Sequence, residues 1–234
     1  MRTEKLYSQP YDNPAVVKLY EDNYIHHTAA KDHVLHEIKS IQNIEKEYDY
    51  KSWCDVACGT AYHLRKAKTD LARCGIDRSS IMIEQHKEDT EYQVEYILCD
   101  FLDWKSSRKF DLVTNFWFGY SHQPTLKLVL EFFDKLVSHT NTGGSILLSL
   151  HNQWKLFDKY PHSTDIEGWE EGKFLFDAIQ WSYEEPSTGD VYECIVPHTQ
   201  LIANRLSPYF NKLVYLDYPT YSAGKELLLL QGKK

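Results

Sequence analysis

Apolar positions along the chain change between helical and strand spacing several times. In residues 28–47, Val34, Leu35, Ile38 and Ile41 recur at the spacing of one helix face. From residue 52 onward, short apolar runs typical of buried strands alternate with amphipathic stretches. The expected helices are 14–24, 28–47, 62–68, 79–87 and 125–138, and the expected strands are 52–57, 71–77, 94–99, 110–115 and 145–150.

This alternation predicts an α/β fold with a mostly parallel sheet and helices on both faces. After residue 150 the pattern changes, and extended segments over 174–184 and 190–203 predict an antiparallel β insertion after strand five, lying over the sheet edge. Two further strands complete a seven-stranded sheet. The expected final strands are 213–216 and 226–231, and the expected turns are 141–144, 187–189 and 221–224.

Charge narrows the class of partner. The formal net charge is -8, and no Lys/Arg cluster occurs. Such a chain suits neither nucleic acid, whose binding depends on phosphate neutralisation, nor an anionic membrane surface. We therefore expect a small-molecule partner, preferably cationic or neutral. The 17 Tyr, 10 Phe and 6 Trp predict a pocket lined partly by aromatic rings.

The cysteines and the N-terminal stretch indicate the compartment. Five cysteines, an odd number without a C-x-x-C pair, are typical of free thiols in a reducing cytoplasm. The first residues are polar, and no run approaches 18 apolar residues, so we expect neither signal peptide nor membrane span. Clustered histidines at 26, 27, 33 and 36 have no Cys or carboxylate-rich partner pattern, so no metal site is expected.

Candidate ligand-binding residues follow the expected strands. In an open parallel sheet, ligands bind beyond the carboxyl ends of the strands. Small residues such as Gly59 after the first strand allow close approach of the backbone. Asp77 after the second strand is placed to accept hydrogen bonds from two ribose hydroxyls, and Asp100 after the third from an adenine amine. Met82 and Phe101 are placed to sandwich the adenine ring.

These segments resemble a known family. Residues 55–64, Asp-Val-Ala-Cys-Gly-Thr-Ala-Tyr-His-Leu, are similar to the first motif of class I S-adenosylmethionine (SAM)-dependent methyltransferases. Residues 75–83 resemble the second motif, and 110–113 the fourth-strand motif. The resemblance implies a Rossmann-like fold, SAM as cofactor and S-adenosylhomocysteine as product, without a metal. The implied cofactor-binding residues are Tyr20, Asp55, Ala57, Gly59, Thr60, Asp77, Arg78, Met82, Asp100, Phe101 and Asn115.

A closer resemblance is to small-molecule N-methyltransferases that act on amino sugars and similar amines. It rests on the Leu-Tyr-x-x-x-Tyr segment at 19–24, the Cys-Gly-Thr-x-x-His-Leu loop at 58–64 and His122 after strand four. It implies that Tyr24 and His122 face the acceptor as catalytic residues, and that the insertion at 173–203 roofs the pocket. Trp117 and Trp154 are the candidate substrate-binding residues, because aromatic faces stabilise cations.

The expected protein is thus one methyltransferase domain over residues 1–234. It comprises an N-terminal helical lid (1–50), a cofactor-binding core (51–150), a substrate-side β insertion (151–204) and the final strands (205–234). We expect transfer to the nitrogen of an amine, amino sugar or guanidino compound, by a monomer or homodimer.

Two other functions remain open from the sequence. A small-molecule O-methyltransferase is the first, since His122 suits either chemistry. The second is a degenerate, non-catalytic methyltransferase fold, which would be favoured by Ala61 at a family glycine position. Sequence alone leaves the acceptor and the number of methyl groups open.

Overall fold

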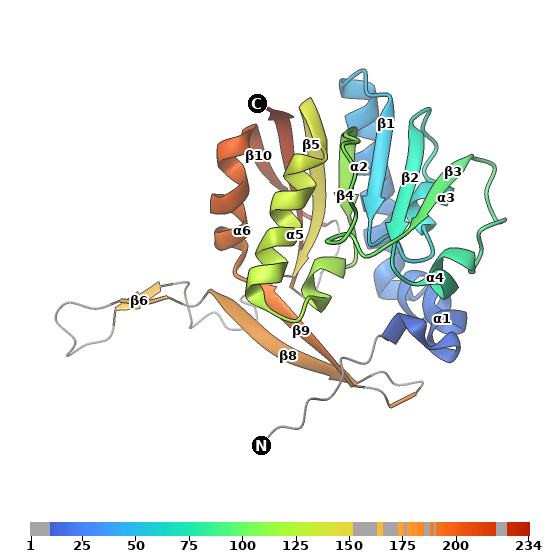
Figure 1. Ribbon diagram of the computed structural model, residues 1–234, viewed down its shortest axis with the longest axis horizontal. Helices are drawn as coiled ribbons and strands as arrows, with labels where there is room; N and C mark the ends of the chain where they lie inside the picture. The colour runs from blue at the N-terminus through green and yellow to red at the C-terminus, as the bar shows by residue number, and fades with distance from the viewer. Residues whose placement is uncertain are drawn as a thin grey trace.

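A seven-stranded sheet forms the centre of the computed structural model (Figure 1). The structure describes residues 10–151, 163–165, 173–175, 177–184, 188–189, 191–218 and 224–234. The strands of the sheet are β1 (Ser52–Val56), β2 (Ala72–Asp77), β3 (Val94–Leu98), β4 (Phe110–Asn115), β5 (Thr140–His151), β10 (Phe210–Leu216) and β11 (Lys225–Lys233).

The order of the strands is β10-β11-β5-β4-β1-β2-β3. The first five strands of the chain pair in parallel, whereas β11 pairs antiparallel with both β5 and β10. The expected mostly parallel, seven-stranded sheet is confirmed. Chain order reverses between β1 and β4, so a crevice for ligands is expected there, beyond the carboxyl ends.

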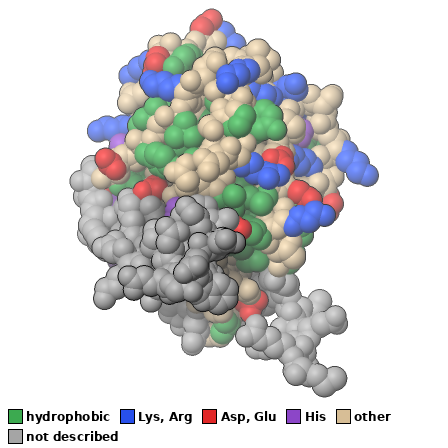
Figure 2. Space-filling model, turned by 90° about the vertical axis from the view of Figure 1, so that its left-hand side faces the viewer, with side chains coloured by type: hydrophobic (Ala, Val, Ile, Leu, Met, Phe, Trp, Pro, Cys, Tyr) green, Lys and Arg blue, Asp and Glu red, His purple; other side chains and the backbone are tan. Residues whose placement is uncertain are grey.

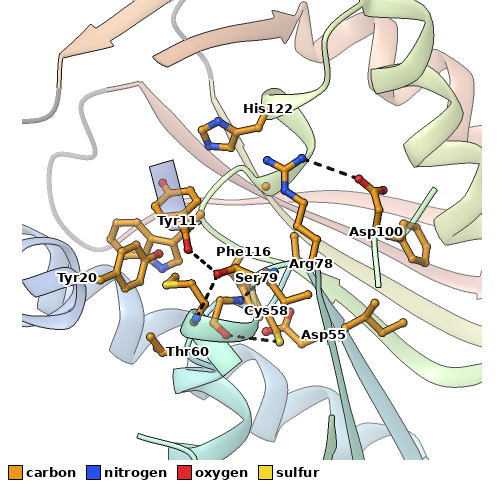
Figure 3. Close-up of a pocket in the computed structure, with 18 of the residues that line it drawn as sticks. Tyr11, Tyr20, Asp55, Cys58, Thr60, Arg78, Ser79, Asp100, Phe116 and His122 are labelled. Carbon is orange, nitrogen blue, oxygen red and sulfur yellow. Dashed lines mark hydrogen bonds and ion pairs between the residues drawn. The ribbon is translucent and has the colours of Figure 1, made fainter. Parts of the chain in front are cut away.

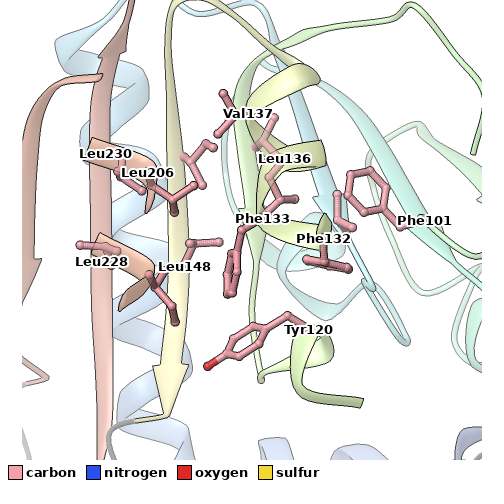
Figure 4. Close-up of a cluster of buried hydrophobic side chains, with 14 of the residues drawn as sticks. Phe101, Tyr120, Phe132, Phe133, Leu136, Val137, Leu148, Leu206, Leu228 and Leu230 are labelled. Atoms are coloured by element: carbon pink, nitrogen blue, oxygen red, sulfur yellow. The ribbon is translucent and has the colours of Figure 1, made fainter. Parts of the chain in front are cut away.

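Helices cover both faces of the sheet and create two hydrophobic cores. α5 (Leu126–Ser138) and α6 (Thr199–Leu206) pack on one face, and α2 (Thr28–Glu47) and α3 (Tyr62–Lys66) on the other. Strand side chains alternate between them, as the pleat requires. Ile146 and Leu148 of β5 point toward α5, in the core that Figure 4 shows, whereas Leu147 points toward α2.

The N-terminal segment is a chain of short helices below the carboxyl ends of the strands (Figure 1). After a 3-10 turn, η1 (Pro10–Asp12), α1 (Pro14–Tyr20) begins with Pro14 at its first position. The Asn13 side chain accepts a hydrogen bond from the Ala15 amide at 3.0 Å, which caps the helix. The expected single helix over 14–24 changes to a π-helix, η2 (Glu21–Ile25).

The insertion after β5 contains the expected antiparallel pair and a second, short pair that the sequence did not predict. β6 (Ser163–Asp165) pairs with β7 (Lys173–Leu175), and β8 (Ala178–Glu184) with β9 (Val191–Pro197). β8 and β9 cross the end of the molecule where the strands of the main sheet end (Figure 1).

Several boundaries differ from the sequence prediction. Residues 199–203 are not extended but begin α6, where the His198 side chain accepts from the Gln200 amide at 3.1 Å and caps the helix. Residues 141–144 are not a turn, because β5 already starts at Thr140 with a register shift opposite β4. The helix expected over 79–87 is only α4 (Ser80–Glu84). The turn expected at 221–224 lies almost wholly outside the described residues.

The surface agrees with the dispersed charge of the sequence. Figure 2 shows Lys and Arg side chains scattered over the visible face rather than gathered into one patch. None of the helices in the described ranges is long and apolar enough to cross a membrane.

A buried arginine ties the N-terminal helices to the sheet. Arg65 of α3 is fully buried, and its guanidinium pairs with buried Glu21 of η2. The same side chain donates to the Thr60 carbonyl at 2.9 Å and pairs with Asp89 at 3.0 Å. The loop after β1 therefore has a fixed position relative to η2.

Replacing Arg65 should strongly destabilise the fold. Arg65→Met leaves the Glu21 carboxylate buried without its cation, which should cost about 3 kcal/mol in free energy of unfolding. Lys66→Met is the matched control, because Lys66 forms an exposed pair with Asp89 and should contribute below about 0.5 kcal/mol. Urea denaturation at pH 7 measures both; equal effects would contradict this assignment.

Candidate active site

Two adjoining pockets lie at the carboxyl ends of the sheet. The first contains about 960 Å³ of empty space, part of it open to solvent, between the ends of β1, β2 and β4 and the N-terminal helices. The second contains about 850 Å³ and reaches β8, β9 and the start of β11. Tyr11, Tyr20, Trp117 and His122 line both, so the two spaces meet at these side chains.

Asp77, the last residue of β2, organises the first pocket. Its carboxylate accepts hydrogen bonds from the Gly59 amide at 2.8 Å and from the Ser79 amide at 2.9 Å. Burial raises the pKa of Asp77, and these two amides oppose the shift. The carboxylate thus joins the loop after β1 to the loop after β2. A carboxylate has about four acceptor sites, so it retains capacity for a ligand.

The loop after β1 has an unusual backbone. Ala57, Gly59 and Ala61 all have positive φ, at 52°, 56° and 56°. For alanine this conformation costs roughly 1 kcal/mol. The loop also packs closely against the start of η3 (Gly119–His122), because a Cβ at Gly119 would lie 2.5 Å from the Ala57 Cβ. Ala61 is completely buried in the α2 core and does not line the pocket, so its methyl group does not crowd a ligand there.

Asp55 is a buried carboxyl group at the floor of the first pocket. Thr114 donates to it at 2.6 Å, and the indole of Trp53 donates in turn to Thr114 at 2.9 Å. Burial raises the pKa of Asp55 to about 7. The carboxyl group is therefore about half ionised at pH 7, and an ammonium group that enters the pocket would favour its ionised form.

The other end of the pocket combines a carboxylate with apolar surfaces. Asp100 accepts from the Leu102 amide at 2.9 Å, and Arg78 approaches its second oxygen at 3.9 Å (Figure 3). Met82 and Phe101 are both buried and both line this space. An aromatic, hydrogen-bonding ring such as adenine fits such surroundings.

The structure adds site residues that the sequence did not single out. Tyr11 lines both pockets; its ring packs edge-on against Tyr20 and His122, and its carbonyl accepts from the Ser79 hydroxyl (Figure 3). No motif marks this residue, because it reaches the site from a segment far away in the sequence.

His63 is a second addition, and it belongs to a buried polar network. Its Nε2 lies 2.8 Å from Glu37 of α2, and its ring stacks on Phe116 at 4.2 Å. Glu37 also accepts from Ser149 at 2.7 Å and from Tyr218 at 2.6 Å. These donors lower the pKa of Glu37 despite its burial, so a carboxylate lies directly behind the pocket wall.

The second pocket is mostly aromatic. Tyr24, Trp181 and Tyr192 line it, together with His151 and Lys225. His122 lies at its junction with the first pocket, with Nδ1 3.9 Å from the sulfur of Cys194. Burial and the charge of Arg78 lower the pKa of His122 to about 4, so its ring is neutral at pH 7.

Most expected site residues line the two pockets. Tyr24 lies on the second, and His122 and Trp117 lie on both. Asn115 does not line either, because its amide points into the sheet and donates to the Val56 carbonyl at 2.6 Å. Trp154 lies outside the described residues. The expected cofactor residues that line the first pocket are Tyr20, Asp55, Ala57, Gly59, Thr60, Asp77, Arg78, Met82, Asp100 and Phe101.

Comparison with known proteins agrees with this geometry. Residues 54–144 match the family model described as a methyltransferase domain. No curated protein matches the sequence. Among solved structures, the DhpI complex with S-adenosylhomocysteine has a TM-score of 0.63 at 14% identity, covering 94% of this chain and 93% of that one.

Two further solved structures are N-methyltransferase NodS from Bradyrhizobium japonicum, with S-adenosylhomocysteine, and CalS10, an amino pentose methyltransferase from Micromonospora echinaspora, with SAM. NodS has a TM-score of 0.61 at 11% identity, covering 96% of this chain and 94% of its own. CalS10 has a TM-score of 0.59 at 15% identity, covering 86% of this chain and 91% of its own.

Residues 54–144 are thus similar to a methyltransferase domain, and the chain has the fold of these solved structures, which hold SAM or S-adenosylhomocysteine. The residues of the first pocket fit that cofactor. The buried hydroxyl of Thr60 has no hydrogen-bond partner in the described part of the chain, which suits a site completed by a polar ligand. In the same ranges, no three His, Cys, Asp or Glu side chains gather as a metal site.

Removing the Asp77 carboxylate should weaken cofactor binding. Asp77→Ala removes the expected ribose acceptor and releases the Gly59 amide, so the dissociation constant for SAM should rise by at least about tenfold. Equilibrium dialysis with labelled SAM measures it. Asp103→Ala, at an exposed carboxylate nearby, should leave affinity unchanged. Unchanged affinity of Asp77→Ala would remove the ribose assignment.

Cofactor affinity should also depend on pH through Asp55. If its carboxylate meets the cofactor ammonium, binding requires the ionised form, whose pKa is about 7 without ligand. Affinity for S-adenosylhomocysteine should then fall about tenfold from pH 8 to pH 6. Calorimetric titrations across this range test the slope, which Asp55→Asn should abolish. A pH-independent affinity in the unmodified protein would contradict the pairing.

Proposed function

We propose that this protein transfers the methyl group of SAM to the nitrogen of a small-molecule amine, amino sugar or guanidino compound. The observation that carries the proposal is the aromatic second pocket, which joins the first at His122, Tyr11, Tyr20 and Trp117. A cofactor in the first pocket and an acceptor in the second would meet there. The similarity in fold to NodS, an N-methyltransferase, and to CalS10, an amino pentose methyltransferase, supports nitrogen as the acceptor atom.

The first pocket provides complementary groups for each part of the cofactor. Asp77 would accept from the ribose hydroxyls, Asp100 from the adenine amine, and Asp55 would meet the ammonium. Met82 and Phe101 would enclose the adenine ring. When bound there, SAM would supply a methyl group on a cationic sulfur. A neutral nucleophile can attack the methyl carbon, and S-adenosylhomocysteine then leaves as the neutral thioether.

His122 is the proposed proton acceptor. An amine attacks only with a free lone pair, and its nitrogen must lose a proton after the new N–C bond forms. Because the pKa of His122 is lowered to about 4, the ring is neutral and can accept a hydrogen bond or a proton. The proton then passes to solvent. A base of this pKa contributes mainly by orienting the N–H group.

Aromatic side chains would orient the acceptor and exclude water. Tyr24 and Tyr20 lie side by side, with ring centroids 5.4 Å apart, and Tyr11 packs edge-on against Tyr20. The Trp117 indole N–H is buried without a partner among the described residues, and it would donate to the acceptor. Positioning in a dry pocket is the main source of acceleration available to this reaction. The substrate-binding role of Trp154 remains a prediction.

Five free cysteines suit the reducing cytoplasm, which we propose as the location. A monomer or homodimer remains the expected assembly.

Acceptor screening tests the nitrogen assignment. Incubation with SAM labelled in the methyl group, against paired amines and hydroxyl compounds of similar shape, should label amines. Label found only on hydroxyl or carboxyl compounds would establish the O-methyltransferase alternative. Cofactor binding without label on any acceptor would favour a non-catalytic binding protein.

Truncating His122 should lower turnover more than cofactor affinity. His122→Ala should reduce kcat by about a hundredfold, because the acceptor loses its proton-accepting and orienting group. The dissociation constant for S-adenosylhomocysteine should change by less than about threefold. Steady-state kinetics with a labelled amine measures the first, and calorimetry the second. A kcat equal to that of the unmodified protein would exclude this role.

A further inference from the structure

A buried histidine lies in the wall of the first pocket. His63 of α3 is 4% exposed and is one of the residues that line this pocket. Its Nε2 lies 2.8 Å from Glu37 of α2, and its ring stacks on Phe116 with the centroids 4.2 Å apart. These two contacts fix the orientation of the ring. The proposed chemistry assigns no role to His63.

Glu37 determines which nitrogen of this ring carries a proton. Although burial opposes it, the hydrogen bond and the charge of His63, with the hydroxyls of Tyr218 and Ser149, lower the pKa of Glu37. An ionised carboxylate only accepts hydrogen bonds, so Nε2 of His63 is protonated and donates to it. Within the described part of the chain, Nδ1 makes no hydrogen bond, so it remains available to a ligand in the pocket.

A second carboxyl group acts on His63 from the floor of the pocket. Burial raises the pKa of Asp55, and the charge of His63 opposes this rise. The positively charged form of His63 therefore interacts favourably with Asp55 as well as with Glu37. Asp55 and His63 both line the first pocket, so an anion and a cation are close together in its wall.

His63 is the basic group best placed to bind an anion beside Asp55. The other basic side chains in the described lining of the first pocket are Arg78 and His122. Arg78 approaches Asp100 at the far end, and His122 is neutral at pH 7 because burial lowers its pKa to about 4. Three residues before His63, the buried hydroxyl of Thr60 has no hydrogen-bond partner among the described residues.

We propose that His63, held by Glu37, binds the α-carboxylate of the cofactor while Asp55 binds its ammonium group. The proposal rests on the cofactor assignment of the proposed function and adds the cation that this assignment lacks. The two charged groups of an α-amino acid are attached to one carbon atom, so their site requires an anion and a cation close together. Thr60 donates a further hydrogen bond to the same carboxylate. Glu37 touches no ligand and is a positioning residue.

A structural role alone does not explain this pair. Buried ion pairs contribute little net stability, and apolar side chains of similar volume often replace them without loss. Glu37 and His63 nevertheless lie beside the apolar core between α2 and the sheet. A carboxylate ligand at Nδ1 forms a charge-assisted hydrogen bond in a site shielded from water, which is stronger than the same contact at a surface.

Removing the carboxylate from the ligand tests the site directly. The decarboxylated analogue of S-adenosylhomocysteine keeps the ammonium group, and methylthioadenosine lacks the whole amino-acid end. In calorimetric titrations at pH 7, the decarboxylated analogue should bind at least about tenfold more weakly than S-adenosylhomocysteine. His63→Gln should reduce this ratio below about threefold, because glutamine keeps an N–H donor for Glu37 but carries no charge. Its affinity for methylthioadenosine should not change.

Glu37→Gln tests the positioning role. The hydroxyls of Ser149 and Tyr218 can donate or accept, so they keep their hydrogen bonds while the negative charge is lost. The ratio between the two ligands should fall at least about threefold with unchanged affinity for methylthioadenosine, whereas a merely structural role would weaken all three ligands alike. His27→Gln is the matched control, because His27 is exposed at the start of α2 and lines neither pocket.

The outcomes separate this proposal from the proposed function. Equal affinity for the two ligands in the unmodified protein, or a ratio that His63→Gln leaves unchanged, would overturn the proposal. If His63→Gln alone does not fold, the double variant Glu37→Gln, His63→Gln replaces the ion pair by two amides and gives the same test. Binding of none of the three ligands would refute the cofactor site and both proposals together. Discrimination that depends on His63, without methylation of any amine, supports the carboxylate site and refutes the proposed activity.

Discussion

The carboxylate of Asp77 is the contact on which the candidate site depends. It accepts hydrogen bonds from the Gly59 amide, 18 residues earlier in the chain, and from the Ser79 amide, so it fixes the loop after β1 relative to the loop after β2. Ser79 in turn caps α4 through a 3.2 Å contact with the Met82 amide and binds the Tyr11 carbonyl. One acceptor thereby connects the sheet, a helix and the N-terminal segment. A ligand at Asp77 would bind to all of them together.

The same region carries features that disfavour folding. Ala57 and Ala61 have left-handed backbone conformations, Asp55 is buried, and Lys225 is held among aromatic rings. Each costs free energy that the surrounding core must offset. Strain and desolvated charge concentrated at the ends of strands are typical of sites where a ligand completes the structure. The large apolar cores on both faces of the sheet provide the stability that offsets these costs.

Much of the fold could be predicted because its signals are local. The bounds of α2 and β4 agree with the hydrophobic pattern, since each element has a clear period and a clear end. The sequence predictions were wrong where tertiary contacts determine the secondary structure. Residues 141–144 were predicted as a turn because of paired glycines, yet Thr140 before them and Ser145 after them both pair with β4, so they form an irregularity within β5. The helix α6 was missed because its eight residues are too short a stretch for the helical period to be distinguished from a strand.

The candidate site was predictable where residues follow strand ends, as Asp55, Asp77 and Asp100 do. Asn115 has the right position along the chain, but its side chain satisfies a backbone carbonyl instead of facing the pocket. His63 lies within the loop at 58–64 that carries the family resemblance, but the sequence does not indicate its contact with Glu37. Tyr11, His151 and Lys225 reach the site from distant segments, and only the folded arrangement brings them together. Single residues of common types carry no motif, so sequence gives no signal for them.

The most direct measurement is a crystal structure of the protein with S-adenosylhomocysteine. We predict ligand density in the first pocket, with the ribose hydroxyls within hydrogen-bond distance of the Asp77 carboxylate and the adenine between Met82 and Phe101. Its sulfur should face the junction at His122. Density in another place, or a ribose that does not contact Asp77, would contradict the account.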